Sequence, residues 1–205
     1  MAKVESLFAT KFYSAPLNSG GRALNAQLRQ ECLSIAAEDN AGRAWSKQHG
    51  YKGYTSYASL NDLPERSPTF DGLAKALDSH AAAFIRVLNV AASPKDFRLN
   101  SLWINVLDPG GVHTGHIHPL SVLSGTYYVD VPKGASALKL EDPRLAQMMA
   151  APPRKPSAPR PEQPFIYVTP SPGRVLMWES WLRHEVPLNS AKTPRISISF
   201  NYGWA

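Results

Sequence analysis

The sequence predicts a mainly β domain of the sandwich or jelly-roll class, with helices at its N-terminal end. Apolar residues recur at helical spacing before residue 96, whereas short alternating segments fill the chain from residue 97 onward. Proline, glycine and asparagine separate these short segments, as they do in turns between strands. No helical pattern lies between them, so parallel strands joined by crossover helices are not expected.

Two helices are predicted in the N-terminal part. Residues 21–38 carry apolar side chains at a spacing of three to four, namely Leu24, Leu28, Cys32 and Ile35. Residues 70–89 carry a second stripe, which consists of Leu73, Leu77, Ala81, Phe84 and Leu88, and Pro68 and Thr69 precede it as a start signal. The connection 49–68 is rich in Gly, Tyr, Ser and Pro, which predicts an irregular loop.

The C-terminal part consists of short predicted strands. In residues 101–107, Leu102, Ile104 and Val106 alternate with Trp103 and Asn105, as in a strand that is buried on one face. Further β-type segments are 124–131, 136–140, 165–168, 174–178 and 195–204, and residues 108–111 are typical of a turn. Residues 151–164 contain six prolines and predict a long surface loop, which is either a connector or a gate to a site.

The bulk composition is typical of a globular protein. The 205 residues are 43% hydrophobic and 19% charged, and the single cysteine, Cys32, on the apolar side of its helix, is interpreted as a buried hydrophobe in a reducing cytoplasm. No apolar run approaches the roughly 20 residues that cross a bilayer, and no secretory signal is found, so a membrane is not an expected partner. The net charge of +6 is dispersed, so nucleic acid is not expected either. Homodimer formation is left open.

The strongest local signal is a histidine cluster. Residues 110–125, GGVHTGHIHPLSVLSG, hold three of the six histidines in the chain. In an extended segment, side chains two residues apart share a face, so His116 and His118 converge while His113 faces away. Two imidazoles suit a borderline metal such as Fe(II), Zn or Ni, and the only histidine downstream that could complete the set is His184. The alternative is that these histidines are structural.

A second signal is the polar face of the last strand. Ile196, Ile198 and Phe200 share one face, and Arg195, Ser197, Ser199 and Asn201 share the other. An arginine that points into a barrel needs an anionic partner, which a bidentate carboxylate provides and a nearby serine hydroxyl supplements. The alternative is a sandwich strand whose polar face lies in solvent.

The order of these motifs resembles a known family. H-x-H-P, then S-G-x-Y-Y, a distal histidine and R-x-S are similar to the Fe(II)/2-oxoglutarate-dependent oxygenases, above all to an uncharacterised bacterial and phage subgroup. The resemblance covers residues 97–204, and LFATKFYSAPL near the N-terminus is also similar. It implies a single domain over 1–205, in which a helical part at 1–95 packs on a double-stranded β-helix at 97–204, a cupin-like jelly roll.

The resemblance also implies the site residues. The catalytic metal ligands would be His116, His118 and His184, and 2-oxoglutarate would bind Arg195 with Ser197 on its 5-carboxylate. Tyr128 occupies the place of a tyrosine that contacts this carboxylate in related hydroxylases, whereas Tyr127 has the opposite parity and packs. The family's usual second ligand is a carboxylate. His118 therefore either binds iron directly or only supports the residues that do. In the second case Glu179, Asp130 or water would complete the set of iron ligands.

The implied activity is oxidation of an unknown small molecule or peptide, a hydroxylation, with Fe(II), O2 and 2-oxoglutarate, which is oxidatively decarboxylated. The alternatives are a cupin-like three-histidine dioxygenase or isomerase that does not use 2-oxoglutarate, and a non-catalytic β-sandwich binding module. Loops 45–68 and 143–164 are expected to select the substrate. Trp103, Trp178 and Trp181 either wall the pocket or, as we favour, belong to the core. Arg183 and Glu185 are expected to point away from the metal.

Overall fold

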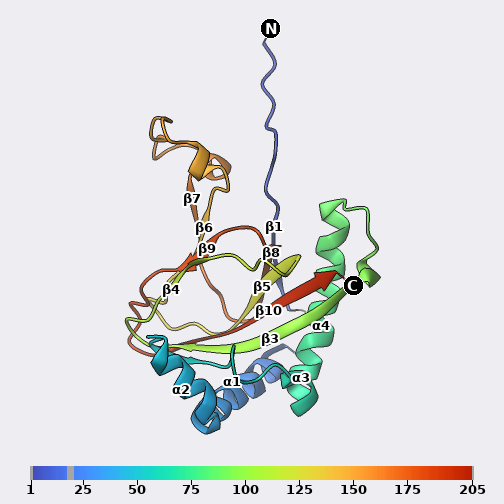
Figure 1. Cartoon of the computed structure of the whole chain (residues 1–205), viewed down its shortest axis with the longest axis vertical. Helices are drawn as coiled ribbons and strands as arrows, with labels where there is room; N and C mark the ends of the chain where they lie inside the picture. The colour runs from blue at the N-terminus through green and yellow to red at the C-terminus, as the bar shows by residue number, and fades with distance from the viewer. Residues whose placement is uncertain (1, 18–20, 205) are drawn as a thin grey trace.

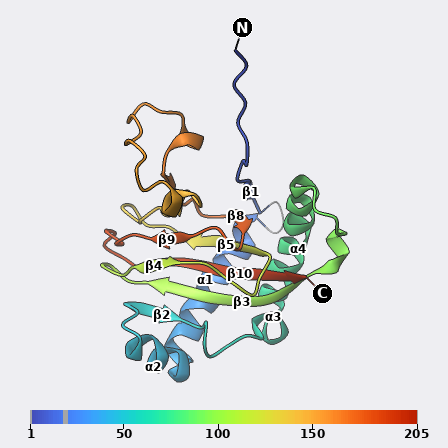
Figure 2. The same cartoon turned by 45° about the horizontal axis from the view of Figure 1, so that its top comes forward.

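The computed structural model describes residues 2–17 and 21–204 and contains two antiparallel sheets with helices on one side (Figures 1 and 2). The larger sheet has the order β1 (Phe12–Pro16), β8 (Arg174–Glu179), β5 (Leu123–Asp130), β10 (Arg195–Trp204), β3 (Phe97–Leu107) and β2 (Gly53–Thr55). The smaller sheet has the order β4 (His113–His116), β9 (His184–Val186), β6 (Leu138–Glu141) and β7 (Phe165–Val168). This is a jelly roll, the predicted double-stranded β-helix.

The larger sheet separates a helix-covered core from a polar interior. Strand β10 lies between β3 and β5, with Ile198 opposite both Ile104 and Tyr127. These three residues face the helices α1 (Gly21–Glu38) and α4 (Pro68–Leu88) and share one buried cluster with their apolar side chains, Leu28 and Leu73 among them (Figure 2). The predicted alternation of β3 and β10 is therefore confirmed, and their polar face is left for the space between the sheets.

Both predicted helices are present, and the structure adds elements that the sequence pattern did not reveal. Ser67 caps α4 by accepting a hydrogen bond from the Thr69 backbone N–H, so the helix begins at Pro68. The segment predicted as an irregular loop contains β2 and the short helix α3 (Leu63–Arg66), and α2 (Asn40–Gln48) precedes it. A strand as short as β2 depends on its pairing with β3, which is a contact between distant parts of the chain.

The proline-rich segment projects from the body of the protein. It belongs to the connection between β6 and β7, which contains the short 3-10 turns Leu145–Gln147 and Arg160–Glu162 and extends away from the sheets (Figure 1). This confirms the predicted surface loop. None of the helices within the described ranges is both long and apolar enough to cross a membrane.

Gly125 provides a test of how tightly β5 is packed against its neighbours in the larger sheet. A Cβ at this position would lie 2.6 Å from the Leu176 carbonyl oxygen and would overlap the Phe200 ring. We expect Gly125→Ala to lower the free energy of unfolding by about 1–3 kcal/mol. Gly72, in α4, has nothing within 4 Å of such a Cβ, so Gly72→Ala should raise it by about 0.5–1 kcal/mol. Urea unfolding of both variants measures the difference, and equal effects would contradict the packing described.

Candidate metal centre and cosubstrate site

A cavity of about 590 Å³ lies between the two sheets. The larger sheet contributes the polar faces of β3 and β10, including Asn105, Arg195 and Ser197, and the smaller sheet contributes β4 and β9. Residues from α2 to β2 and just beyond complete the wall, namely Trp45, His49, Gly50, Tyr51, Thr55 and Tyr57. The first of the two predicted substrate loops therefore lines the cavity. No lining residue comes from 143–164, the other predicted loop.

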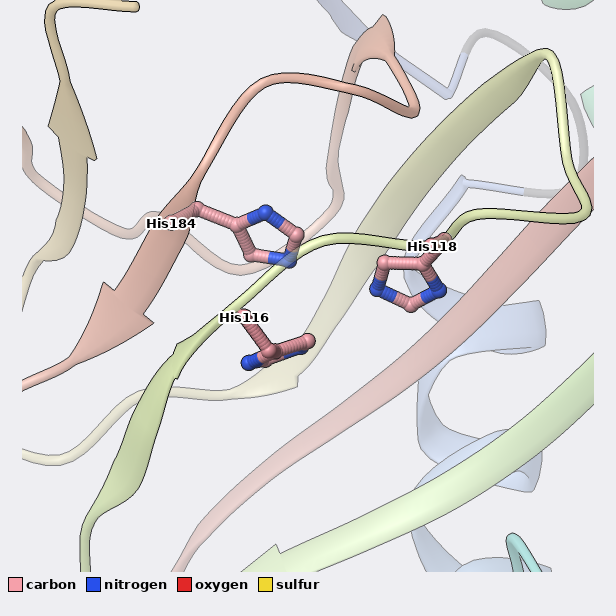
Figure 3. Close-up of side chains that lie close together, drawn as sticks. All are labelled: His116, His118 and His184. Atoms are coloured by element: carbon pink, nitrogen blue, oxygen red, sulfur yellow. The ribbon is translucent and has the colours of Figure 1, made fainter. Parts of the chain in front are cut away.

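Three histidines meet in this cavity (Figure 3). His116 ends β4 and lies opposite His184 of β9 in the sheet register, with ring centroids 4.4 Å apart. His118 follows the end of β4, and its backbone N–H donates to the Ser180 carbonyl at 3.0 Å. One ring nitrogen from each histidine lies within 4.8 Å of the others, which is close enough for one ion between them. The predicted convergence of the three side chains is confirmed.

Backbone carbonyls fix the protonation of two of these rings. Nδ1 of His116 lies 2.7 Å from the Thr114 carbonyl oxygen, and Nδ1 of His184 lies 2.9 Å from that of Leu182. A carbonyl oxygen only accepts, so each Nδ1 carries the hydrogen and each Nε2 keeps a free lone pair. Such a hydrogen bond orients a metal-binding imidazole and raises its basicity. His118 is held differently, by stacking on Trp103 with ring centroids 5.9 Å apart.

His113 also lies in the cavity, contrary to the predicted orientation. The β4–β9 register shifts between His113 and His116, which cancels the strict alternation of an extended strand. The His113 ring consequently lies 6.4 Å from that of His116 and packs edge-on against Tyr51, and its buried Nε2 has no hydrogen-bond partner among the described residues. A β-bulge cannot be recognised from spacing alone, which explains the error.

Burial keeps the imidazoles of His113, His118 and His184 neutral at pH 7. It lowers the pKa of His184 to about 3 and that of His118 to about 4, and the neighbouring His116 adds to both shifts. Burial lowers the pKa of His113 to about 3, with a further contribution from the charge of Arg195. Neutral imidazoles present lone pairs, so His118 and His184 can bind a metal without first losing protons.

These shifts predict that the metal-free protein loses stability in mild acid. Unfolded histidines have a pKa of about 6.5, so between pH 6.5 and about 4 the unfolded chain binds more protons than the folded one. The free energy of unfolding is therefore highest above pH 6.5 and falls as the pH decreases. A buried histidine such as His184 lowers it by up to about 2 kcal/mol at pH 5. Thermal unfolding in chelator at pH 7 and pH 5 should show a lower Tm at pH 5. The decrease should be smaller in His113→Phe, and a Tm independent of pH in this range would contradict the prediction.

Arg195 is a buried cation without an anionic partner. It is 4% exposed, and one guanidinium nitrogen donates to the Ser136 carbonyl at 3.2 Å, while Nε has no partner. None of the ion pairs in the described part of the chain includes it. An unpaired buried charge is costly, so the site favours an anion at this point. Ser197, beside it on β10, also lines the cavity.

The two tyrosines of β5 separate as predicted. Tyr127 packs in the helix-covered core, where its hydroxyl donates to Asn25. The Tyr128 ring lies 5.1 Å from the Arg195 guanidinium carbon, and its buried hydroxyl has no partner among the described residues. Tyr128 packs behind Arg195 rather than on the cavity wall, which Tyr51 lines instead. Sequence reasoning missed Tyr51 because no local pattern distinguishes it from the other tyrosines in its loop.

The structure also places the remaining aromatic and charged residues that the sequence singled out. Trp103 and Trp178 are buried and line the cavity, whereas Trp181 is 46% exposed and belongs to neither the core nor the cavity wall. Arg183 pairs with Glu141, and Glu185 pairs with Lys139, away from the histidines as predicted. Asp130 pairs with Arg29, and neither it nor Glu179 belongs to the histidine group.

Comparison with known proteins assigns the β core to a family. Residues 101–201 match the sequence profile of the family described as "Putative 2OG-Fe(II) oxygenase", where 2OG is 2-oxoglutarate. The β core of the chain belongs to this family. Fe(II) and 2-oxoglutarate are accordingly its cofactor and cosubstrate, and O2 is its oxidant. No curated protein matches this oxygenase in sequence.

Solved structures support the fold of the oxygenase. It is similar to the epimerase SnoN in complex with Fe3+, alpha ketoglutarate and nogalamycin RO (16% identity, TM-score 0.64, 96% of this chain and 80% of that one). A Pseudomonas putida prolyl-4-hydroxylase matches at 15% identity and TM-score 0.61, over 96% of this chain and 89% of that one. HygX from Streptomyces hygroscopicus, with nickel and 2-oxoglutarate bound, matches at 15% identity and TM-score 0.61, over 96% and 83%. These matches confirm the double-stranded β-helix.

Proposed function

We propose that this oxygenase is a hydroxylase, which couples oxidative decarboxylation of 2-oxoglutarate to oxidation of a small molecule or a peptide. The observation that carries the proposal is that one cavity holds both a group of three histidines and a buried arginine without a counter-ion. The first suits Fe(II), and the second suits the dianionic cosubstrate. A three-histidine protein that did not use 2-oxoglutarate would have no need for the buried charge of Arg195.

In this proposal His116, His118 and His184 hold the metal. His116 and His184 would bind through Nε2, since their Nδ1 atoms donate to backbone carbonyls. When bound, iron and 2-oxoglutarate together supply the O2-dependent oxidation, in which 2-oxoglutarate yields succinate and CO2. With His118 in place of the family's carboxylate, the ligand set has one negative charge fewer. The site is then more positive, which favours anionic 2-oxoglutarate and shifts the redox behaviour of the metal.

The protein's own part is to bind, orient and exclude water. Arg195 and Ser197 would bind the distal carboxylate of 2-oxoglutarate, and Tyr128, whose ring lies against the guanidinium, would hold Arg195 in place. Trp103 and Trp178 keep water from the metal side of the cavity. Residues from both 1–95 and 97–204 line this cavity, which supports a single functional unit over 1–205.

Hydroxylation is tested with isotopic oxygen, because a hydroxylase places one atom of O2 in its product and an epimerase does not. The protein is loaded with Fe(II) and 2-oxoglutarate and incubated under ¹⁸O2 with a metabolite extract and a peptide mixture. We expect succinate to form with one ¹⁸O atom in its new carboxylate, and one other compound to gain the second ¹⁸O atom. Succinate formation with a changed substrate that contains no ¹⁸O would contradict hydroxylation. No succinate above a metal-free control would favour a metalloprotein that does not use 2-oxoglutarate.

A further inference from the structure

Tyr51 lies in the cavity although it comes from outside the β core that defines the family. Its buried hydroxyl has no hydrogen-bond partner among the described residues. Its backbone is held on both sides, since the Tyr51 N–H donates to the Ser46 carbonyl at 2.8 Å and the carbonyl of Lys52 accepts from the Asp108 N–H at 3.1 Å. The next residue, Gly53, pairs with Leu107 at the end of β3. The phenol is therefore presented by a fixed loop.

His113 supports Tyr51 from the opposite sheet. The two rings meet edge to face, with centroids 4.8 Å apart and planes at 64°. Like the phenol, the imidazole has a buried polar atom, Nε2, without a partner among the described residues. Burial raises the pKa of Tyr51, and the charge of Arg195 acts in the opposite direction on the same group. The phenol is a hydrogen-bond donor at pH 7, and both rings line the same cavity as Arg195.

Unpartnered buried polar atoms gather around Arg195. Such atoms are rare in folded proteins, and each calls for an explanation. In the described ranges they number seven, and five belong to Arg195, to residues that contact it or to residues that line its cavity: Tyr51 Oη, His113 Nε2, Tyr128 Oη, Ser136 Oγ and Arg195 Nε. Ser136 contacts Arg195 because its carbonyl accepts a hydrogen bond from the guanidinium. Tyr128 contacts Arg195 because its ring packs against the guanidinium. Three of these groups, Tyr51, His113 and Arg195, line the cavity. Each can donate a hydrogen bond and a carboxylate only accepts, so they are complementary to a carboxylate.

We propose that Tyr51 and His113 complete the site for the distal carboxylate, and that Tyr51 makes the enzyme selective for a dicarboxylic 2-oxo acid. The inference rests on the proposed function, in which Arg195 binds this carboxylate. It gives the N-terminal part a direct role in cosubstrate binding, beyond covering the sheet. A 2-oxo acid without the distal carboxylate would leave these donors buried and unpaired, so it should bind weakly.

The test separates the distal carboxylate from the rest of the ligand. The affinities of 2-oxoglutarate and of 2-oxopentanoate, which has a methyl group in place of that carboxylate, are measured by calorimetry on Mn(II)-loaded wild type, Tyr51→Phe and His113→Phe. Tyr51→Phe removes one oxygen atom and keeps the ring. We expect it to lower the affinity for 2-oxoglutarate by about tenfold or more, as for loss of a hydrogen bond to a charged group. The affinity for 2-oxopentanoate should change by less than about twofold. His113→Phe should have the same selectivity, to a smaller extent.

Tyr167→Phe is the matched control, because Tyr167 is 59% exposed on β7 and does not line the cavity. It should bind both acids as the wild type does. An unchanged affinity of Tyr51→Phe for 2-oxoglutarate, or an equal loss for the two acids, would overturn the proposal. A non-selective effect of His113→Phe would overturn the part assigned to His113. No metal-dependent binding of 2-oxoglutarate by the wild type would instead contradict the proposed function, and this inference with it.

Discussion

His184→Ala is expected to abolish tight metal binding and, with it, the turnover of 2-oxoglutarate. His184 is 6% exposed and is the one member of the group that comes from β9, so no neighbouring side chain replaces it. Loss of a group that merely supports a ligand costs roughly 10–100-fold in metal affinity, and loss of the ligand itself should cost more. The affinity for Fe(II) or Mn(II), measured by competition with a chromophoric chelator, should therefore fall by at least about 100-fold.

His80→Ala is the control for the loss of a partly buried histidine. His80 lies on α4, hydrogen-bonds Tyr13 and is remote from the cavity wall, so its variant should bind metal as the wild type does. A His184→Ala protein that remains folded and keeps its full metal affinity would remove His184 from the ligand set.

Arg195→Met is expected to eliminate 2-oxoglutarate binding while leaving the metal site intact. The loss of a buried, hydrogen-bonded charge pair costs about 2–5 kcal/mol in binding, which corresponds to a roughly 30- to 4,000-fold weaker affinity. The ligand-free protein should behave in the opposite way. Since the guanidinium is buried without a carboxylate, methionine of similar length should leave the Tm unchanged or raise it.

The two effects are separated by thermal unfolding of Mn(II)-loaded protein with and without 2-oxoglutarate. In the wild type the cosubstrate should raise the Tm, and in Arg195→Met it should not. Metal affinity measured in parallel should be the same in both proteins. A strongly destabilised ligand-free variant would mean that Arg195 is structural, and a retained shift with 2-oxoglutarate would mean that the carboxylate binds elsewhere.

The elements that the sequence predicted well are those whose pattern is local. Strand β10 alternates strictly over its central residues, so its two faces, including Arg195 and Ser197, follow from the order of residues alone. The stripe of α4 likewise gives a buried helix face. The convergence of His116 with His184 could be expected only from the order of motifs in a family, because the register that pairs β4 with β9 joins residues far apart in the chain.

The parts that could not be predicted depend on tertiary contacts. His113 faces the cavity because of an irregularity in pairing, which strand parity does not contain. Tyr51 lines the same cavity as Arg195 because β2 pairs with β3, and a strand of three residues has no signal of its own. The unpartnered atoms around Arg195 are invisible in the sequence, since they are defined by what the folded chain leaves unsatisfied.

In the proposed site, three imidazoles share one iron beside a bound dicarboxylate. Diffraction from crystals grown anaerobically with Fe(II) and 2-oxoglutarate tests this arrangement through the anomalous signal at the iron edge. We predict one anomalous peak within bonding distance of His116, His118 and His184, with the distal carboxylate on Arg195. A peak bound by only two of these histidines and a carboxylate side chain, or no peak between them, would contradict the account.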